Sequence, residues 1–258
     1  MDTTLVLLGC AVMGLIIGSF LTVVVDRVPR GGSVVEPPSA CGACGNRLGP
    51  LDLVPIASWL VLRGKCRHCG NPIGKEPLII EIATATIFVL FGVKLGADAV
   101  LPAFWSLGAA LVALVWIDLR EQRLPREITY TAFALSSIVI VVASLYNDEP
   151  ERIWQSALGA GIALAIMGLI YLASRGGMGD GDVRLAPLLG LHLGYLNPRI
   201  VPVGLFWGFL LGAVVGVAMM AVSKAGRKTA LPFGPFLAAG TVIAVFGGQW
   251  FVNLIWHR

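Results

Sequence analysis

The sequence predicts an all-α polytopic membrane protein of about eight transmembrane helices with a small cytoplasmic zinc-ribbon-like loop domain. Three observations lead to this fold class. The 258 residues are 57% hydrophobic and 13% charged, and the mean hydropathy is +0.83. Long apolar runs recur along the chain, and four cysteines gather in its one long polar stretch. This composition excludes a water-soluble globular protein and makes the lipid bilayer the first expected partner.

Six apolar runs are long enough to cross about 30 Å of hydrocarbon as helices. They cover residues 5–25, 99–117, 128–146, 153–174, 200–222 and 231–256. Two weaker segments complete the expected eight: residues 78–93, which contain Glu81, and residues 185–198, which are short and contain His192. Seven spans is the alternative count. The first run has no basic n-region and no small-residue cleavage site, so we expect a helix rather than a signal peptide.

The pattern divides the chain into three parts. These are a first transmembrane helix over residues 1–25, a cytoplasmic four-cysteine domain over residues 26–77 and a transmembrane helical bundle over residues 78–258. With the N-terminus outside, eight spans place the loops 26–77, 118–127, 175–184 and 223–230 in the cytoplasm. These loops hold 15 of the 19 lysines and arginines, which is the distribution of the positive-inside rule. The net charge of +4 therefore reflects topology, and we expect no nucleic-acid partner.

The polar stretch contains two Cys-x-x-Cys-Gly knuckles separated by 21 residues, one more than is usual for a four-cysteine zinc ribbon. Two disulfides are the alternative, but the loop is expected on the reducing side of the membrane. The stretch has little apolar sequence for a core, whereas a structural zinc ion can supply on the order of 10 kcal/mol of folding free energy. The sequence therefore predicts a structural Zn²⁺ bound by Cys41, Cys44, Cys66 and Cys69.

Two aspartates lie at the cytoplasmic ends of expected spans: Asp118 ends the third, and Asp182 opens the sixth. The topology thus brings them to one face, where two carboxylates can share a proton and activate water, the chemistry of an aspartic protease. Taken singly, each has a simpler explanation as a charged residue at a helix end. An N-cap explains one of Asp180 and Asp182, but not the glycines around them, which include Gly179 and Gly181.

Together these motifs resemble the bacterial type IV prepilin peptidases, which are aspartic proteases of the Gly-x-Gly-Asp type. The resemblance covers nearly the whole chain. Asp118 precedes a Leu-Pro pair, as in the family, and Asp182 ends a Gly-Asp-Gly-Asp motif. Thr22, Arg126 and Arg184 depart from the family's usual residues. The remaining matches are the opening signature at 18–29, the paired knuckles with 53–60 and 63–66, and the segments 77–81 and 231–236.

The resemblance implies a membrane aspartic endopeptidase that cleaves the leaders of prepilins or pseudopilins at the cytoplasmic face of the bacterial inner membrane. Asp118 and Asp182 would be its catalytic residues, supported by Gly179 and Gly181. It also implies N-methylation of the new N-terminal residue with S-adenosylmethionine. The sequence has no glycine-rich nucleotide-binding loop after a strand, so the residues that bind this donor are left open. Glu81 is a candidate either for orienting the nascent amine or for pairing with a loop arginine.

Two other protein classes also contain intramembrane aspartates. A proton-coupled transporter, with the ribbon as a docking module, needs ionisable groups near the midplane, where His192 is the one weak candidate. A presenilin-like intramembrane protease shares the Gly-x-Gly-Asp motif but gives no reason for the cysteine knuckles. Within the bundle, a stripe of glycines is expected to serve either internal helix packing or the approach of a substrate helix. The stripe consists of Gly204, Gly208, Gly212 and Gly216.

Overall fold

The computed structural model describes residues 2–174, 177–222 and 231–256. The chain forms two compact units, Met1–Leu101 and Pro102–Arg258. Every extended regular element in the described ranges is a helix, and two isolated β-bridges are the only strand-like pairings there. The predicted all-α polytopic class is therefore confirmed.

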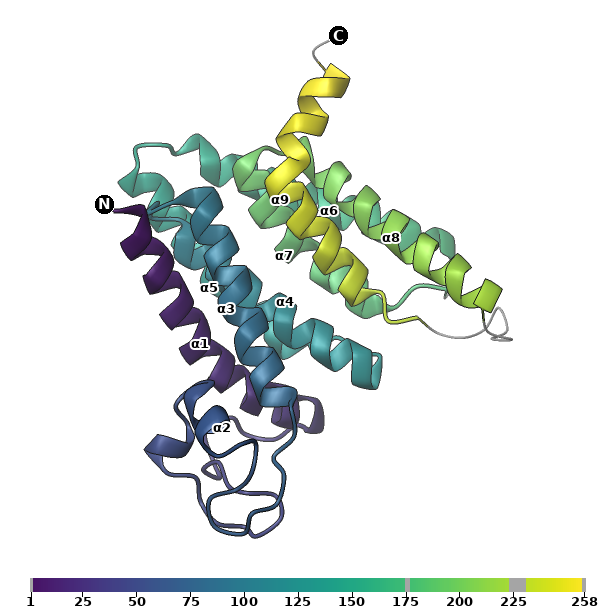
Figure 1. The fold of residues 1–258 in the computed structure, drawn as a ribbon. Coiled ribbons are helices and arrows are strands. Elements are labelled where there is room, and N and C mark those ends of the chain that lie inside the picture. Colours follow the sequence, from purple (N-terminus) through teal and green to yellow (C-terminus); the bar gives the residue numbers. More distant parts are fainter. Residues whose placement is uncertain (1, 175–176, 223–230, 257–258) are drawn as a thin grey trace. The chain divides into compact units, whose positions relative to one another are not determined.

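The first unit is a pair of long helices joined by the cysteine-rich loop. Helices α1 (Thr3–Arg27) and α3 (Glu76–Leu95) lie side by side, with the loop at one end of the pair (Figure 1). They approach backbone to backbone, because a Cβ on Gly18 would lie 2.7 Å from the Cα atom of Glu81. The loop contains η1 (Val28–Arg30), η2 (Pro50–Asp52) and the short helix α2 (Ala57–Val61). Both ends of the loop are thus held by the helix pair.

By packing, α3 belongs with α1 in the first unit. The sequence pattern instead assigns α3 to the peptidase bundle, residues 78–258. That assignment concerns function and stays a prediction.

Six helices lie in the described part of the second unit: α4 (Leu101–Glu121), α5 (Arg126–Tyr146), α6 (Glu151–Ser174), α7 (Asp180–Leu196), α8 (Ile200–Val222) and α9 (Gly234–Trp256). Helix α7 is its most enclosed element, with 12 of its 17 residues buried. It lies against α6 at glycines: a Cβ on Gly159 would be 2.3 Å from the carbonyl oxygen of Gly190. The two backbones are therefore in direct contact.

Seven of the described helices are long and apolar enough to cross a membrane: α1, α3, α4, α5, α6, α8 and α9. The remaining long helix, α7, begins five residues before the expected segment 185–198, and its 17 residues span about 26 Å. Its start contacts Leu124, just past the end of α4, through Gly181. Near its other end, Nε2 of His192 lies 3.0 Å from the carbonyl oxygen of Ala103, at the start of α4. Helix α7 therefore runs antiparallel to α4 and corresponds to the short segment predicted at 185–198. Seven helices meet the criteria for a span among the described residues, and the crossing by α7 stays a prediction.

The glycine stripe of α8 serves internal packing. A Cβ on Gly240 of α9 would lie 2.4 Å from the backbone nitrogen of Gly208, and one on Gly212 would lie 2.9 Å from the ring of Phe233. The two helices run antiparallel, because Gly248 near the end of α9 faces Ile200 at the start of α8. Of the two roles considered for the stripe, packing is the one observed, and α9 occupies the face considered for a substrate helix.

The close approach of α6 and α7 gives a matched pair of substitutions. Gly159→Ala would place a methyl group against the α7 backbone and cost about 1–3 kcal/mol by overpacking. A Cβ on Gly161, two residues along the same helix, meets no atom within 4 Å. Gly161→Ala should therefore keep or raise stability, since alanine is the better helix former by about 1 kcal/mol. Thermal unfolding in detergent measures both; equal melting temperatures for the two variants would contradict this packing.

Candidate active site and metal centre

Asp118 lies in the last turn of α4 and is 5% exposed. Its Oδ2 atom accepts a hydrogen bond from the backbone N–H of Gly234, at 2.9 Å. Gly234 is the first residue of α9, so the carboxylate satisfies one of the unpaired N–H groups at that helix start. The positive end of the α9 helix dipole also favours a negative charge there. Asp118 therefore joins the end of α4 to the start of α9.

Asp182 lies in the first turn of α7 and is 7% exposed. No hydrogen bond to its carboxylate is found within the described residues. Gly179 lies beside it, since a Cβ there would be in ordinary van der Waals contact with its Oδ2 atom, at 3.4 Å. Its charge interacts with the like charge of Asp118. The two carboxylates predicted to meet at one face therefore lie within electrostatic reach of each other.

Leu124 is the apolar contact between the start of α7, which carries Asp182, and the start of α9, which donates to Asp118. A Cβ on Gly181 would lie 3.1 Å from Cβ of Leu124, and one on Gly234 would lie 3.1 Å from its Cδ2 atom and 2.9 Å from Oδ2 of Asp118. Any larger residue at Gly181 or Gly234 would push against Leu124 or the carboxylate. These two glycines thus allow the starts of α7 and α9 to close around the end of α4.

Asp180 has a different environment from Asp182. Its side chain is 72% exposed, and its Oδ2 atom forms an ion pair with Nη2 of Arg184 at 2.9 Å, one turn along α7. A pair this exposed contributes at most about 1 kcal/mol. Of the two aspartates in the Gly-Asp-Gly-Asp motif, the buried one is therefore the one close to Asp118. Gly176, which belongs to the glycine-rich segment before the motif, lies outside the described residues.

The four predicted zinc ligands form one cluster. The sulfur atoms of Cys41, Cys44, Cys66 and Cys69 all lie within 4.8 Å of one another, and all four thiols are free. Tetrahedral coordination with bonds of about 2.3 Å places sulfur atoms about 3.8 Å apart, and the sulfurs of Cys41 and Cys69 are 3.9 Å apart. The cluster therefore has the donor set and spacing of a structural four-cysteine metal site.

The two knuckles have the same backbone geometry. In each, the first cysteine accepts at its carbonyl from the glycine four residues on, at 2.8 Å for Gly45 and 3.0 Å for Gly70. Both glycines have positive φ, which side chains rarely adopt. Backbone amides of Cys44 and Ala43 donate toward the Cys41 sulfur and lower the pKa of that thiol to about 6. This favours the thiolate at Cys41, the form that binds metal, whereas burial and the neighbouring sulfurs raise the pKa of Cys69 to about 11.

Glu81 is 6% exposed and lies in the first unit, on α3. Its Oε2 atom accepts a hydrogen bond from the backbone N–H of Ile56 at 2.7 Å. Pairing with a loop arginine is one of the two roles expected for Glu81 from the sequence. No ion pair between Glu81 and an arginine is found among the described residues. Arg67 instead pairs with Asp52, Nε to Oδ1 at 2.7 Å.

Three features of these sites were not identified from the sequence. The first is the hydrogen bond from the Gly234 N–H to Asp118. Gly234 belongs to the segment 231–236, which matches a family motif but carries no predicted role. Leu124 is the leucine of the Leu-Pro pair after Asp118, and the motif does not indicate its contacts with Gly181 and Gly234. The link from Glu81 to Ile56 joins residues 25 apart and depends on a non-glycine residue with φ of 58°, for which the sequence carries no signal.

Comparison with known proteins identifies two consecutive family matches. Residues 12–95 match the Bacterial Peptidase A24 N-terminal domain, and residues 105–217 match the Type IV leader peptidase family. No solved structure matches this chain.

Three relatives illustrate how far the similarity extends, and each is named prepilin leader peptidase/N-methyltransferase. The one from Bacillus subtilis is 30% identical over 240 residues, which cover 92% of this chain and 93% of the relative. The one from Pseudomonas aeruginosa is 31% identical over 92% of this chain and 89% of the relative. The one from Burkholderia pseudomallei is 32% identical over 95% and 86%. Because such relatives align along nearly its whole length, this chain belongs to the type IV leader peptidase family.

Proposed function

We propose that this protein is a membrane aspartic endopeptidase that removes the leader of type IV prepilins or pseudopilins and then methylates the new N-terminal amine with S-adenosylmethionine. The observation that carries the peptidase proposal is the buried pair Asp118 and Asp182, which α4, α7 and α9 bring together. The names of the relatives support both activities.

The surroundings of the two carboxylates suggest how they divide the chemistry. Asp118 accepts the N–H of Gly234 at a helix start, so it is the better placed to be ionised and to take a proton from the attacking water. Asp182, with no donor among the described residues, then holds the shared proton and polarises the scissile carbonyl. Each proton-transfer role contributes typically about 10²–10⁴ in rate.

The orientation of the protein follows from its charges. Arg120, Arg123 and Arg126 flank the end of α4 beside Asp118. Residues 26–77, which include the cysteine-rich loop, carry seven further lysines and arginines. We infer that both loops face the cytoplasm of the bacterial inner membrane and that the N-terminus lies outside. The third basic loop that supports this orientation, residues 223–230, lies outside the described residues.

A structural Zn²⁺ held by the four cysteines would stabilise the loop domain. The loop has few buried apolar side chains, so a hydrophobic core contributes little to its stability. Binding of one ion by both knuckles would supply folding free energy instead. In this proposal the metal takes no part in peptide cleavage.

The transporter alternative finds little support at His192. Its two ring nitrogens lie 2.9 and 3.0 Å from the carbonyl oxygens of Leu188 and Ala103, and the residue is fully buried. The contact with Ala103 joins α7 to α4, and that with Leu188 lies within α7. The imidazole is therefore enclosed by helix backbone and does not line a route for ions or protons. Membership of the leader peptidase family also accounts for the cysteine knuckles, which a presenilin-like protease does not.

Substitution of either aspartate tests the peptidase. Asp118→Asn and Asp182→Asn should each lower leader cleavage by about 10²-fold or more, because neither amide can exchange a proton with the remaining carboxylate. Membrane insertion should be unchanged. Asp180→Asn is the matched control and should be mild, since that carboxylate is exposed and paired with Arg184. Cleavage is measured from the mass of a co-expressed prepilin; an active Asp182→Asn enzyme beside an inactive Asp180→Asn enzyme would contradict the assignment.

Removal of the metal should separate the two activities. Replacing Cys41 and Cys44 with serine should release about one Zn²⁺ per chain, because hydroxyls do not replace thiolate ligands. Methylation should then fall more than cleavage, since the aspartates belong to the other unit. Metal analysis and the mass of the pilin measure this, methylation adding about 14 Da.

Cys10→Ser is the control, because Cys10 is buried in α1 and is not part of the cluster. Zinc-free protein that still gives fully methylated pilin would show that the cluster has another task.

A further inference from the structure

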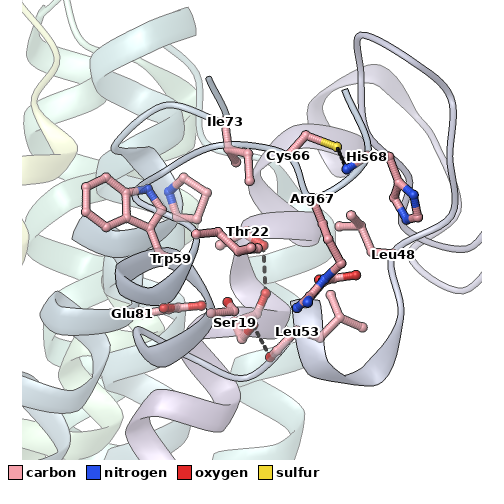
Figure 2. Close-up of a pocket in the computed structure, with 14 residues that line it drawn as sticks. Ser19, Thr22, Leu48, Leu53, Trp59, Cys66, Arg67, His68, Ile73 and Glu81 are labelled. Carbon is pink, nitrogen blue, oxygen red and sulfur yellow. Dashed lines mark hydrogen bonds and ion pairs between the residues drawn. The ribbon is translucent and has the colours of Figure 1, made fainter. Parts of the chain in front are cut away.

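The first unit contains a pocket of about 110 Å³ between α1, α3 and the cysteine-rich loop (Figure 2). Ser19 and Thr22 of α1, Trp59 of α2 and Glu81 of α3 line it, together with several apolar side chains that include Leu53 and Ile73. Trp59 and Glu81 lie on one side, and Arg67 and His68 on the other (Figure 2). All of these residues belong to one unit, and neither the carboxylate pair nor the cysteine cluster accounts for the pocket.

The pocket contains one carboxylate whose charge is not neutralised. Asp52 is paired with Arg67 and also accepts from the backbone N–H of Gly49 at 3.0 Å, and both interactions lower the pKa of that carboxyl. Glu81 has only the backbone N–H of Ile56, on Oε2; its other oxygen has no hydrogen-bond donor within the described parts of the chain. A carboxylate that is more than nine-tenths buried is unfavourable without further donors or a counter-charge. The pocket is therefore complementary to a small cation.

Trp59 adds a second feature suited to a cation. Its Nε1–H donates to the carbonyl oxygen of Gly74 at 2.8 Å, and Gly64 packs under the ring, where a Cβ would lie 2.8 Å from Cζ2. These contacts fix the indole. An aromatic face beside a carboxylate favours a cationic group, and the apolar lining favours a hydrocarbon side chain attached to it.

The size of the pocket decides between the two cationic substrates of a methylation reaction. Pockets that enclose a drug-sized ligand have volumes of about 300–1,000 Å³, and S-adenosylmethionine is a ligand of that size. The pocket of about 110 Å³ is too small for it. An amine with one apolar side chain is a fragment of suitable size.

We propose that this pocket binds the free N-terminal amine of the cleaved pilin, with Glu81 as the ligand of the amine and Trp59 as a wall for the first side chain. The proposal rests on the methylation activity proposed above. A primary amine reaches the pocket as an ammonium group, which donates to the free oxygen of Glu81. The same carboxylate can accept the proton that must leave before the nitrogen lone pair can react.

Glu81 also has a structural role, which the test must distinguish from binding of the amine. It holds the N–H of Ile56, whose φ of 58° is unusual for a β-branched residue, at the start of α2. Glu81→Gln retains an oxygen that can accept this hydrogen bond and removes the charge. Glu81→Ala removes both. Glu76→Gln, at the start of the same helix and outside the pocket, is the matched control.

The binding experiment uses the purified full-length protein in detergent, with leucinamide as the probe and N-acetyl-leucinamide as its uncharged twin. Titration calorimetry should detect leucinamide and not the acetylated compound. Glu81→Gln should weaken leucinamide binding by about tenfold or more, since a charge-assisted hydrogen bond is lost, while Glu76→Gln should bind as the wild type does. Equal binding of the two compounds by the wild type would overturn the proposal.

The activity experiment measures pilin mass and zinc content for the same variants. Glu81→Gln should lower methylation by about tenfold or more, with cleavage and zinc content kept. A Glu81→Gln enzyme that methylates normally, beside a Glu81→Ala enzyme that does not, would show a structural role alone and overturn the proposal. If the wild type binds leucinamide through Glu81 but methylates no pilin, the amine site stands and the proposed methyltransferase function fails.

Discussion

The hydrogen bond from the Gly234 N–H to Asp118 is the interaction on which the candidate active site depends. It ties the end of α4 to the start of α9, and it gives a buried carboxylate both a donor and the positive end of a helix dipole. Without such a donor, burying one carboxylate is costly, and burying a second beside it is more so. Asp182, whose carboxylate has no hydrogen-bond donor among the described residues, thus lies close to a carboxylate that has one.

The pair of carboxylates requires three helix ends to converge, the end of α4 and the starts of α7 and α9, and glycines make the convergence possible. Gly181 and Gly234 leave room for Leu124 between the starts of α7 and α9. Farther along the bundle, glycines place α7 against α6 and α8 against α9, so the positions of these helices are set by backbone contact. In the first unit, the same kind of contact between α1 and α3 fixes Glu81 beside the pocket. Rigid helix packing therefore positions the charged groups in both units.

Much of this arrangement could be predicted from the sequence. Apolar runs gave the helices, since length and hydropathy determine what crosses a bilayer, and the knuckle spacing gave the cysteine cluster. The pairing of Asp118 with Asp182 followed from counting spans, although the catalytic roles of both remain proposals. The start of the short helix α7 was the least well predicted. Hydropathy placed it at residue 185, whereas the helix begins at Asp180, because residues 180–184 include three charges. Contacts such as Glu81 to Ile56 depend on loop geometry, which periodicity does not encode.

The central claim, that Asp118 and Asp182 act as one unit, is tested most directly by a double-mutant comparison of residual cleavage rates. Residues that exchange one proton lose their joint function when either is changed, so their effects do not multiply. The rates of Asp118→Asn, Asp182→Asn and the double variant are to be measured with purified enzyme and one prepilin over long incubations. We predict that the double variant is no slower than the slower single variant. Losses that multiply in the double variant would contradict a shared site.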